Sequence, residues 1–173
     1  DLVGGGIFYR SGFLGDSTVI GNVEAGHIWI NHDVFDRSGL GLGPAVTQQI
    51  SAPGVTGQFD FHATMVGHVL AGTGYVAASG TNAGGYTYLG VGMAPHAQLW
   101  SGAIATAYAT GTSEIGSFSA TPQSTIPVFR QFFQGISGTA ADVINSSYGF
   151  GDPAATDPVA IDQAAADLVN VEQ

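Results

Sequence analysis

The stretch Asp60-Phe-His-Ala-Thr-Met-Val-Gly-His-Val-Leu-Ala-Gly72 combines a histidine with an apolar run of helical period. Apolar residues such as Val66 and Leu70 recur at helical spacing, and small residues between them form a second stripe that allows close packing. The pattern predicts a buried helix that begins at His62 and ends at the close of this stretch. A histidine held rigidly at the edge of a core has the fixed geometry that a general base needs. A first-turn histidine without chemistry is the alternative interpretation.

Short apolar runs and amphipathic stretches alternate on either side of this helix. The runs over residues 18–23, 97–105 and 141–146 predict buried strands, and helices are predicted over residues 125–136, with Pro127 near the first turn, and from Asp157 onward. Residues 27–58 are predicted to be mostly loop, and residues 73–90 a loop or hairpin. Strands that alternate with helices indicate an α/β fold, with a doubly wound, mainly parallel sheet and helices on both faces.

The histidine stretch resembles the corresponding segment of the subtilisin-like serine peptidases, whose pattern is His-Gly-Thr-x-Val-Ala-Gly. Three more segments follow the family's pattern and order, namely Ser17-Thr-Val-Ile-Gly-Asn-Val-Glu-Ala-Gly26, Gly92-Met-Ala-Pro-His-Ala-Gln-Leu99 and Ala141-Asp-Val-Ile-Asn-Ser-Ser-Tyr-Gly149. They resemble the first core strand, the entry to a later strand and the strand that lines the substrate cleft. The resemblance implies that residues 1–173 are the N-terminal part of a single peptidase domain, whose sheet is incomplete in this chain.

Family membership would imply peptide-bond hydrolysis through an acyl-enzyme. In that chemistry a serine attacks the carbonyl, a histidine takes its proton, and a carboxylate orients the histidine. By position, His62 is the general base. The acid departs from the family, because this chain has Asn-Val-Glu24-Ala-Gly where the family has Val-Ile-Asp-x-Gly. Since other triad hydrolases use either acid, Glu24 is predicted to orient His62.

Two alternatives stay open for the acid. Asp60 lies two residues before His62, although an acid there is also expected to cap the helix that follows. Glu24 could instead be a solvated residue at a strand end, and the protein would then be a subtilase-like pseudoenzyme that binds peptides or serves as structure. Ala63 stands where the family has glycine; its methyl group is expected near the cleft, where it would be tolerated.

The segment Ser147-Tyr148-Gly149 occupies the place of the family's substrate-binding strand. A peptide substrate would pair with this edge through main-chain hydrogen bonds, and Gly149 would leave room for its backbone. Ser147 is not the nucleophile in this alignment; its alternative role is that of a turn residue at a strand end. Because active sites of parallel sheets gather at the carboxyl ends of strands, Glu24 and this segment are expected at the same rim as His62.

A nucleophile segment is missing from this sequence. Neither Gly-x-Ser-x-Gly nor Gly-Thr-Ser-x-Ala occurs, and the nearest similar stretch, Gly111-Thr-Ser-Glu114, precedes the cleft strand and opens no apolar helix. We therefore expect a separate C-terminal chain of the same precursor to supply the oxyanion asparagine and the nucleophilic serine. The substrate implied by the resemblance is a peptide or protein.

The charge of the chain excludes some partners. Three arginines, no lysine and 13 carboxylates give a formal charge of -10, which repels nucleic acids and anionic lipids. No stretch is long and apolar enough to span a membrane, and the absence of cysteine leaves the redox compartment open. A secreted or otherwise extracytoplasmic location is expected from the resemblance alone.

The expected chemistry requires no cofactor, although many relatives bind structural calcium. The one candidate metal cluster is His27 and His32 with Asp33 and Asp36. The spacing of the two histidines fits neither a helix face nor a strand face, so solvated loop histidines are the preferred interpretation and no metal ligand is assigned.

Overall fold

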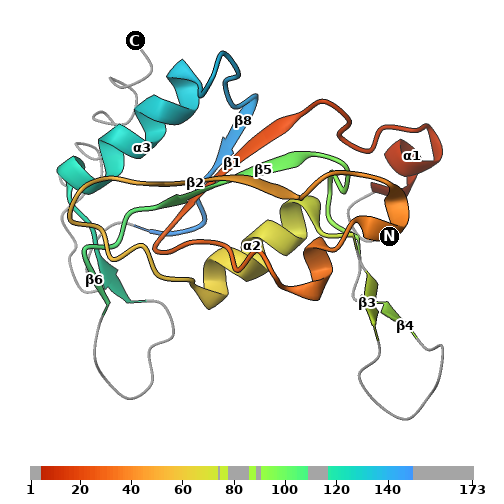
Figure 1. Ribbon diagram of the computed structural model, residues 1–173, viewed down its shortest axis with the longest axis horizontal. Coiled ribbons are helices and arrows are strands. Elements are labelled where there is room, and N and C mark those ends of the chain that lie inside the picture. The colour runs from red at the N-terminus through yellow and green to blue at the C-terminus, as the bar shows by residue number, and fades with distance from the viewer. Residues whose placement is uncertain (1–4, 74, 78–85, 89–90, 109–116, 150–173) are drawn as a thin grey trace.

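The computed structural model describes the chain except for residues 1–4, 74, 78–85, 89–90, 109–116 and 150–173 (Figure 1). Its centre is a four-stranded sheet of order β2-β5-β1-β8, in which every neighbouring pair is parallel. The strands are β1 (Val19–Glu24), β2 (Val46–Ser51), β5 (Gln98–Ala103) and β8 (Val143–Asn145). The sheet confirms the predicted α/β fold with a mainly parallel sheet.

Helices and two small antiparallel pairs surround the sheet. The helices are α1 (Gly5–Arg10), α2 (Phe61–Ala71) and α3 (Pro122–Gln134), with short 3-10 turns η1 (Asp33–Phe35) and η2 (Ser38–Leu40). Strands β3 (Tyr75–Ala77) and β4 (Tyr86–Tyr88) form one pair, and β6 (Ala107–Tyr108) and β7 (Phe118–Ser119) form the other. Of the two alternatives predicted for residues 73–90, a loop or a hairpin, the antiparallel first pair agrees with the hairpin.

The two longer helices cover opposite faces of the sheet (Figure 1). Ile20 and Leu99 share one core cluster with Ala63 of α2, whereas Val23 shares the other with Phe132 of α3. Because both faces are buried, all six residues of β1 are buried, and the strand shows no alternation of buried and exposed side chains. This double burial explains why the sequence predicts the central strands well.

Glycine in β1 allows α3 to approach the sheet closely. A Cβ atom at Gly21 would lie 2.8 Å from Cε2 of Phe132, and one at Gly102 of β5 would lie 2.5 Å from Cγ1 of Val128. The two glycines therefore make room for the side chains of α3, which is a recurrent use of glycine inside strands.

Strand β2 lies in residues 27–58, which the sequence predicts to be mostly loop. This prediction is wrong for Val46–Ser51, where only Ile50 is buried. Because β2 is an edge strand paired only with β5 in the described sheet, its polar side chains stay exposed and give neither an apolar run nor an alternation. Helix α1 is likewise not anticipated by its glycine-rich sequence.

Helix α3 begins three residues earlier than predicted, and Pro127 lies inside it rather than near its first turn. Thr121 caps the helix by accepting a hydrogen bond from the Ser124 N–H, while the Ser124 hydroxyl accepts one from the Thr121 N–H. This reciprocal cap with Pro122 in the first turn fixes the start of the helix. The helix predicted from Asp157 lies outside the described residues.

The chain continues on both sides of β1. The chain reaches β2 and β5 on one side of β1, and then crosses to β8 on the other side by way of α3. In parallel α/β sheets such a reversal leaves a crevice at the carboxyl ends of the two flanking strands, here β1 and β8. The two strands end at Glu24 and Asn145.

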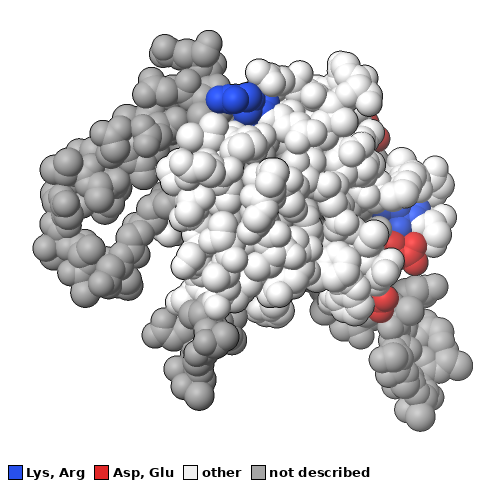
Figure 2. All heavy atoms as spheres, turned by 60° about the vertical axis from the view of Figure 1, so that its left-hand side comes forward, with Lys and Arg blue, Asp and Glu red and all other residues white. Residues whose placement is uncertain are grey.

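Charged side chains are sparse on the described surface shown in Figure 2, in line with the few charged residues of the sequence. No helix in the described ranges is both long enough and apolar enough to cross a membrane.

Candidate active site

Glu24 and His62 meet at the carboxyl end of β1. Glu24 is the last residue of β1, and His62 is the second residue of α2. The distance between His62 Nδ1 and Glu24 Oε2 is 3.1 Å; the His62 side chain is 36% exposed and that of Glu24 is 1% exposed. A carboxylate in the core thus contacts an imidazole that reaches solvent.

The second oxygen of Glu24 also has a donor. The main-chain N–H of Ser147 donates to Glu24 Oε1 at 2.9 Å, from the segment that follows β8. A carboxylate only accepts, so its bond to His62 places the proton on Nδ1 and leaves the lone pair of the ring on Nε2. That tautomer suits a general base, because Nε2 is the atom that takes the proton of a nucleophile.

Burial raises the pKa of Glu24, because the charged carboxylate loses its hydration. The Ser147 N–H and the His62 ring act in the opposite direction and lower the pKa, and the charge of Asp60 raises it further. The hydrogen bonds from His62 and from the Ser147 N–H thus offset part of the free energy lost when the Glu24 carboxylate is buried. Both bonds require α2 and the end of β8 to keep their positions relative to β1.

Asp60 caps helix α2 rather than orienting His62. Its Oδ1 accepts a hydrogen bond of 2.8 Å from the Ala63 N–H, which satisfies one of the free donors of the first turn. Ala63 is fully buried in the core, so the expectation that its methyl group lies near the cleft is wrong. The helix packs this face on the sheet, and small residues are needed there.

The three predicted cleft residues follow β8 directly. Ser147 and Gly149 are exposed, and a Cβ atom at Gly149 would meet no other described atom within 4 Å. Tyr148 is half-buried, packs its ring edge-on against Phe118 at 5.7 Å, and has its pKa raised to about 12, chiefly by burial. Within the described sheet, β8 pairs only with β1. No other described strand pairs with the outer edge of β8, which the three cleft residues continue.

His27 is buried, so its interpretation as a solvated loop residue is wrong. Its Nδ1 lies 3.2 Å from Ser101 Oγ and its Nε2 lies 2.8 Å from Ser51 Oγ. Burial lowers the pKa of His27, which favours the neutral ring. His32 instead accepts a hydrogen bond from the Val34 N–H. Where the structure describes the chain, no three His, Cys, Asp or Glu residues gather closely enough to hold a metal ion.

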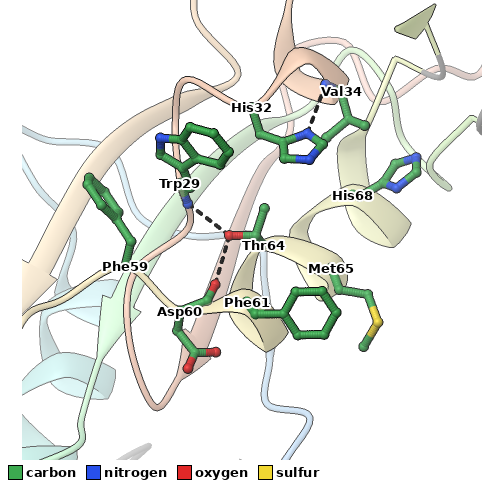
Figure 3. Close-up of a pocket in the computed structure, with 9 residues that line it drawn as sticks. All are labelled: Trp29, His32, Val34, Phe59, Asp60, Phe61, Thr64, Met65 and His68. Atoms are coloured by element: carbon green, nitrogen blue, oxygen red, sulfur yellow. Dashed lines mark hydrogen bonds between the residues drawn. The ribbon is translucent and has the colours of Figure 1, made fainter. Parts of the chain in front are cut away.

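A cavity of about 570 Å³ lies along the flank of α2, and Trp29, His32, Phe61, Met65 and His68 are among its lining residues (Figure 3). Thr64 ties the two walls of the cavity together, because its hydroxyl accepts from the Trp29 N–H at 3.0 Å and donates to the Asp60 carbonyl at 2.8 Å. Neither Glu24 nor His62 is among the residues that line this cavity.

Fold and site together define an α/β protein with a carboxylate–histidine pair at the carboxyl ends of its parallel strands. Comparison of the chain with protein-family models, with curated proteins and with solved structures finds no match.

Proposed function

We propose that this chain supplies the acid–base pair of a subtilisin-like serine endopeptidase. The observation that carries the proposal is the contact of 3.1 Å between Nδ1 of His62 and the buried carboxylate of Glu24. The two residues come from segments that resemble the acid strand and the histidine helix of these peptidases. Glutamate then takes the place that aspartate holds in the family.

In the proposed mechanism, a serine hydroxyl attacks the peptide carbonyl while Nε2 of His62 takes its proton. Glu24 stabilises the imidazolium that forms and keeps the ring from rotating. His62 then gives the proton to the leaving amine, and a second round with water releases the acyl group. The N–H of Ser147 fixes the Glu24 carboxylate throughout, because it bonds to the oxygen that His62 does not use.

We further propose that the serine and an oxyanion asparagine come from a C-terminal chain of the same precursor. Among the described residues, Glu24 is the only one that bonds to the His62 ring. The substrate would be a polypeptide strand that pairs with the open edge at Ser147, Tyr148 and Gly149. No step in this chemistry needs a metal ion.

Proteolysis of casein by the natural, fully assembled protein tests the proposal. His62→Ala and Glu24→Gln are each expected to reduce kcat by a factor on the order of 10⁴, as the loss of a triad member does. Asp60→Asn is the matched control, because asparagine also caps helices and the mechanism gives this residue no proton. The proposal fails if His62→Ala keeps its activity, or if Asp60→Asn loses as much as Glu24→Gln.

A peptide-binding pseudoenzyme is the second candidate. It is favoured by the lack of a serine bonded to His62 in the described part of the chain. Such a protein would retain peptides at the edge of β8 without cleaving them, and the His62→Ala variant would bind them equally well.

A further inference from the structure

Two asparagines connect the three elements that carry the site. Asn22 of β1 donates from Nδ2 to the Ala63 carbonyl at 3.2 Å. Asn145 of β8 donates from Nδ2 to Asn22 Oδ1 at 3.1 Å, and also to Ser147 Oγ at 3.0 Å. The orientation of both amides follows from chemistry, since the Ala63 carbonyl only accepts and the NH₂ group of Asn145 has two hydrogens to give.

These bonds close a ring around the candidate active site. Ala63 follows His62 in the chain, and the N–H of Ser147 holds the carboxylate of Glu24 at 2.9 Å. Starting from Glu24, the ring therefore runs through His62, the first turn of α2, the two asparagines and Ser147, and returns to Glu24.

Asn22 is unusual in its surroundings. It is fully buried in a strand whose neighbours Val19, Ile20 and Val23 are all apolar. A buried amide costs free energy unless its hydrogen bonds are made, and an apolar side chain would fill the same place without that cost. Asn22 also lies two residues before Glu24, so both side chains project from the same face of the strand.

We propose that Asn22 and Asn145 are positioning residues, which hold the His62 ring and the Glu24 carboxylate at bonding distance. The inference rests on the roles proposed above for His62 and Glu24. The longer side chain of glutamate has one more rotatable bond than aspartate, so its contact with His62 needs the start of α2 to be fixed relative to β1. The bond from Asn22 to the Ala63 carbonyl supplies that constraint one residue away from the base.

The test measures the rate at which the Nδ1 proton of His62 exchanges with water. Proton NMR of the protein labelled with ¹⁵N-histidine monitors this rate. The resonance of this proton is assigned by its loss in His62→Gln. Asn22→Leu and Asn145→Ala are each expected to speed this exchange roughly tenfold. Gln49→Leu is the matched control: it removes an amide-to-carbonyl bond of 3.3 Å, to Ile28, that lies outside the ring, and it should leave the exchange unchanged.

An unchanged rate in either folded ring variant would overturn the proposal, and so would an equal effect of Gln49→Leu. Asn145 is half-buried in an edge strand, so Asn145→Ala carries the test if Asn22→Leu does not fold. The exchange measurement needs no nucleophile, so it can fail or succeed whether or not the protein cleaves peptides. In an active protein, Asn22→Leu should lower kcat and leave KM unchanged, because Asn22 does not bond to the proposed substrate-binding segment.

Discussion

At the scale of single residues, the central feature is a carboxylate that the fold buries. Glu24 is fully enclosed, yet each of its oxygens accepts one hydrogen bond, from His62 and from the Ser147 N–H. Ionising a buried acid costs free energy, because the carboxylate loses its hydration. Such acids are found where their charge acts on a neighbouring group, as in functional sites.

The cost of that charge predicts an unusual dependence of stability on pH. Burial raises the pKa of Glu24 above its ordinary value of 4.5, so its contribution to stability is full below pH 4.5 and is lost as the pH rises through the folded-state pKa. Glu24→Gln, which is never charged, should therefore match the wild type near pH 4 and be the more stable protein at pH 7. Urea unfolding at both values measures the difference. A loss of stability of Glu24→Gln relative to the wild type as the pH rises would contradict this prediction.

Only part of the site is predictable at this scale. His62 and Glu24 are found because their segments follow a known pattern. The donor to the second Glu24 oxygen is a main-chain N–H, which any residue at position 147 other than proline would offer, so no side-chain pattern reveals it. The sequence marks Asn22 as unusual, because it is a polar residue in a predicted buried strand. Its hydrogen-bond partners on α2 and β8 are known only from the structure.

At the scale of elements, the start of α2 decides where His62 lies. The Asp60 side chain caps the helix through the Ala63 N–H, and the Thr64 hydroxyl bonds back to the Asp60 carbonyl. The helix thus begins at a defined residue, which sets the direction of the His62 side chain.

Removal of the cap should destabilise the protein, because the first turn of α2 then loses a side-chain acceptor. Asp60→Ala is expected to lower the free energy of unfolding by about 1 kcal/mol, as the loss of an N-cap usually does. Asp60→Ser should lower it much less, because serine also caps helices. Chemical denaturation of the two variants gives the comparison. Equal stabilities of Asp60→Ala and Asp60→Ser would show that the cap is not significant.

Helix α3 offers a matched pair of aromatic residues. Phe132 is fully buried against Gly21 and Trp100, while its neighbour Phe133 is 39% exposed. Phe132→Ala should destabilise by roughly 3–5 kcal/mol, because it leaves a cavity between helix and sheet. Phe133→Ala should cost about 1 kcal/mol or less, since much of its ring already contacts water. Similar urea midpoints for the two variants would mean that α3 does not pack as described.

The elements differ in how well the sequence predicts them, and burial explains the difference. Strands β1 and β5 are covered on both faces and carry mostly apolar and small residues, and α3 shows aromatic residues at helical spacing. Strand β2 has mostly exposed side chains, so its sequence resembles a loop. The start of α3 depends on a cap formed by Thr121 and Ser124, which lie before the apolar pattern begins.

At the scale of the whole molecule, the outer edge of β8 bears on the proposed partner. Its outer side pairs with no described strand, and the segment that follows it holds Glu24. An exposed strand edge offers unpaired main-chain groups to another polypeptide. If the proposed C-terminal chain and peptide substrate bind, we expect them to meet the described sheet on this side.

Intact-mass spectrometry of the natural, assembled protein after treatment with a fluorophosphonate shows whether His62 activates a serine. The probe modifies a serine only where a working base activates it. We expect one adduct, on a serine outside residues 1–173, and its loss in His62→Ala. Unmodified protein, or an adduct that persists in His62→Ala, would contradict the proposal that Glu24 and His62 form the acid–base pair of a serine peptidase.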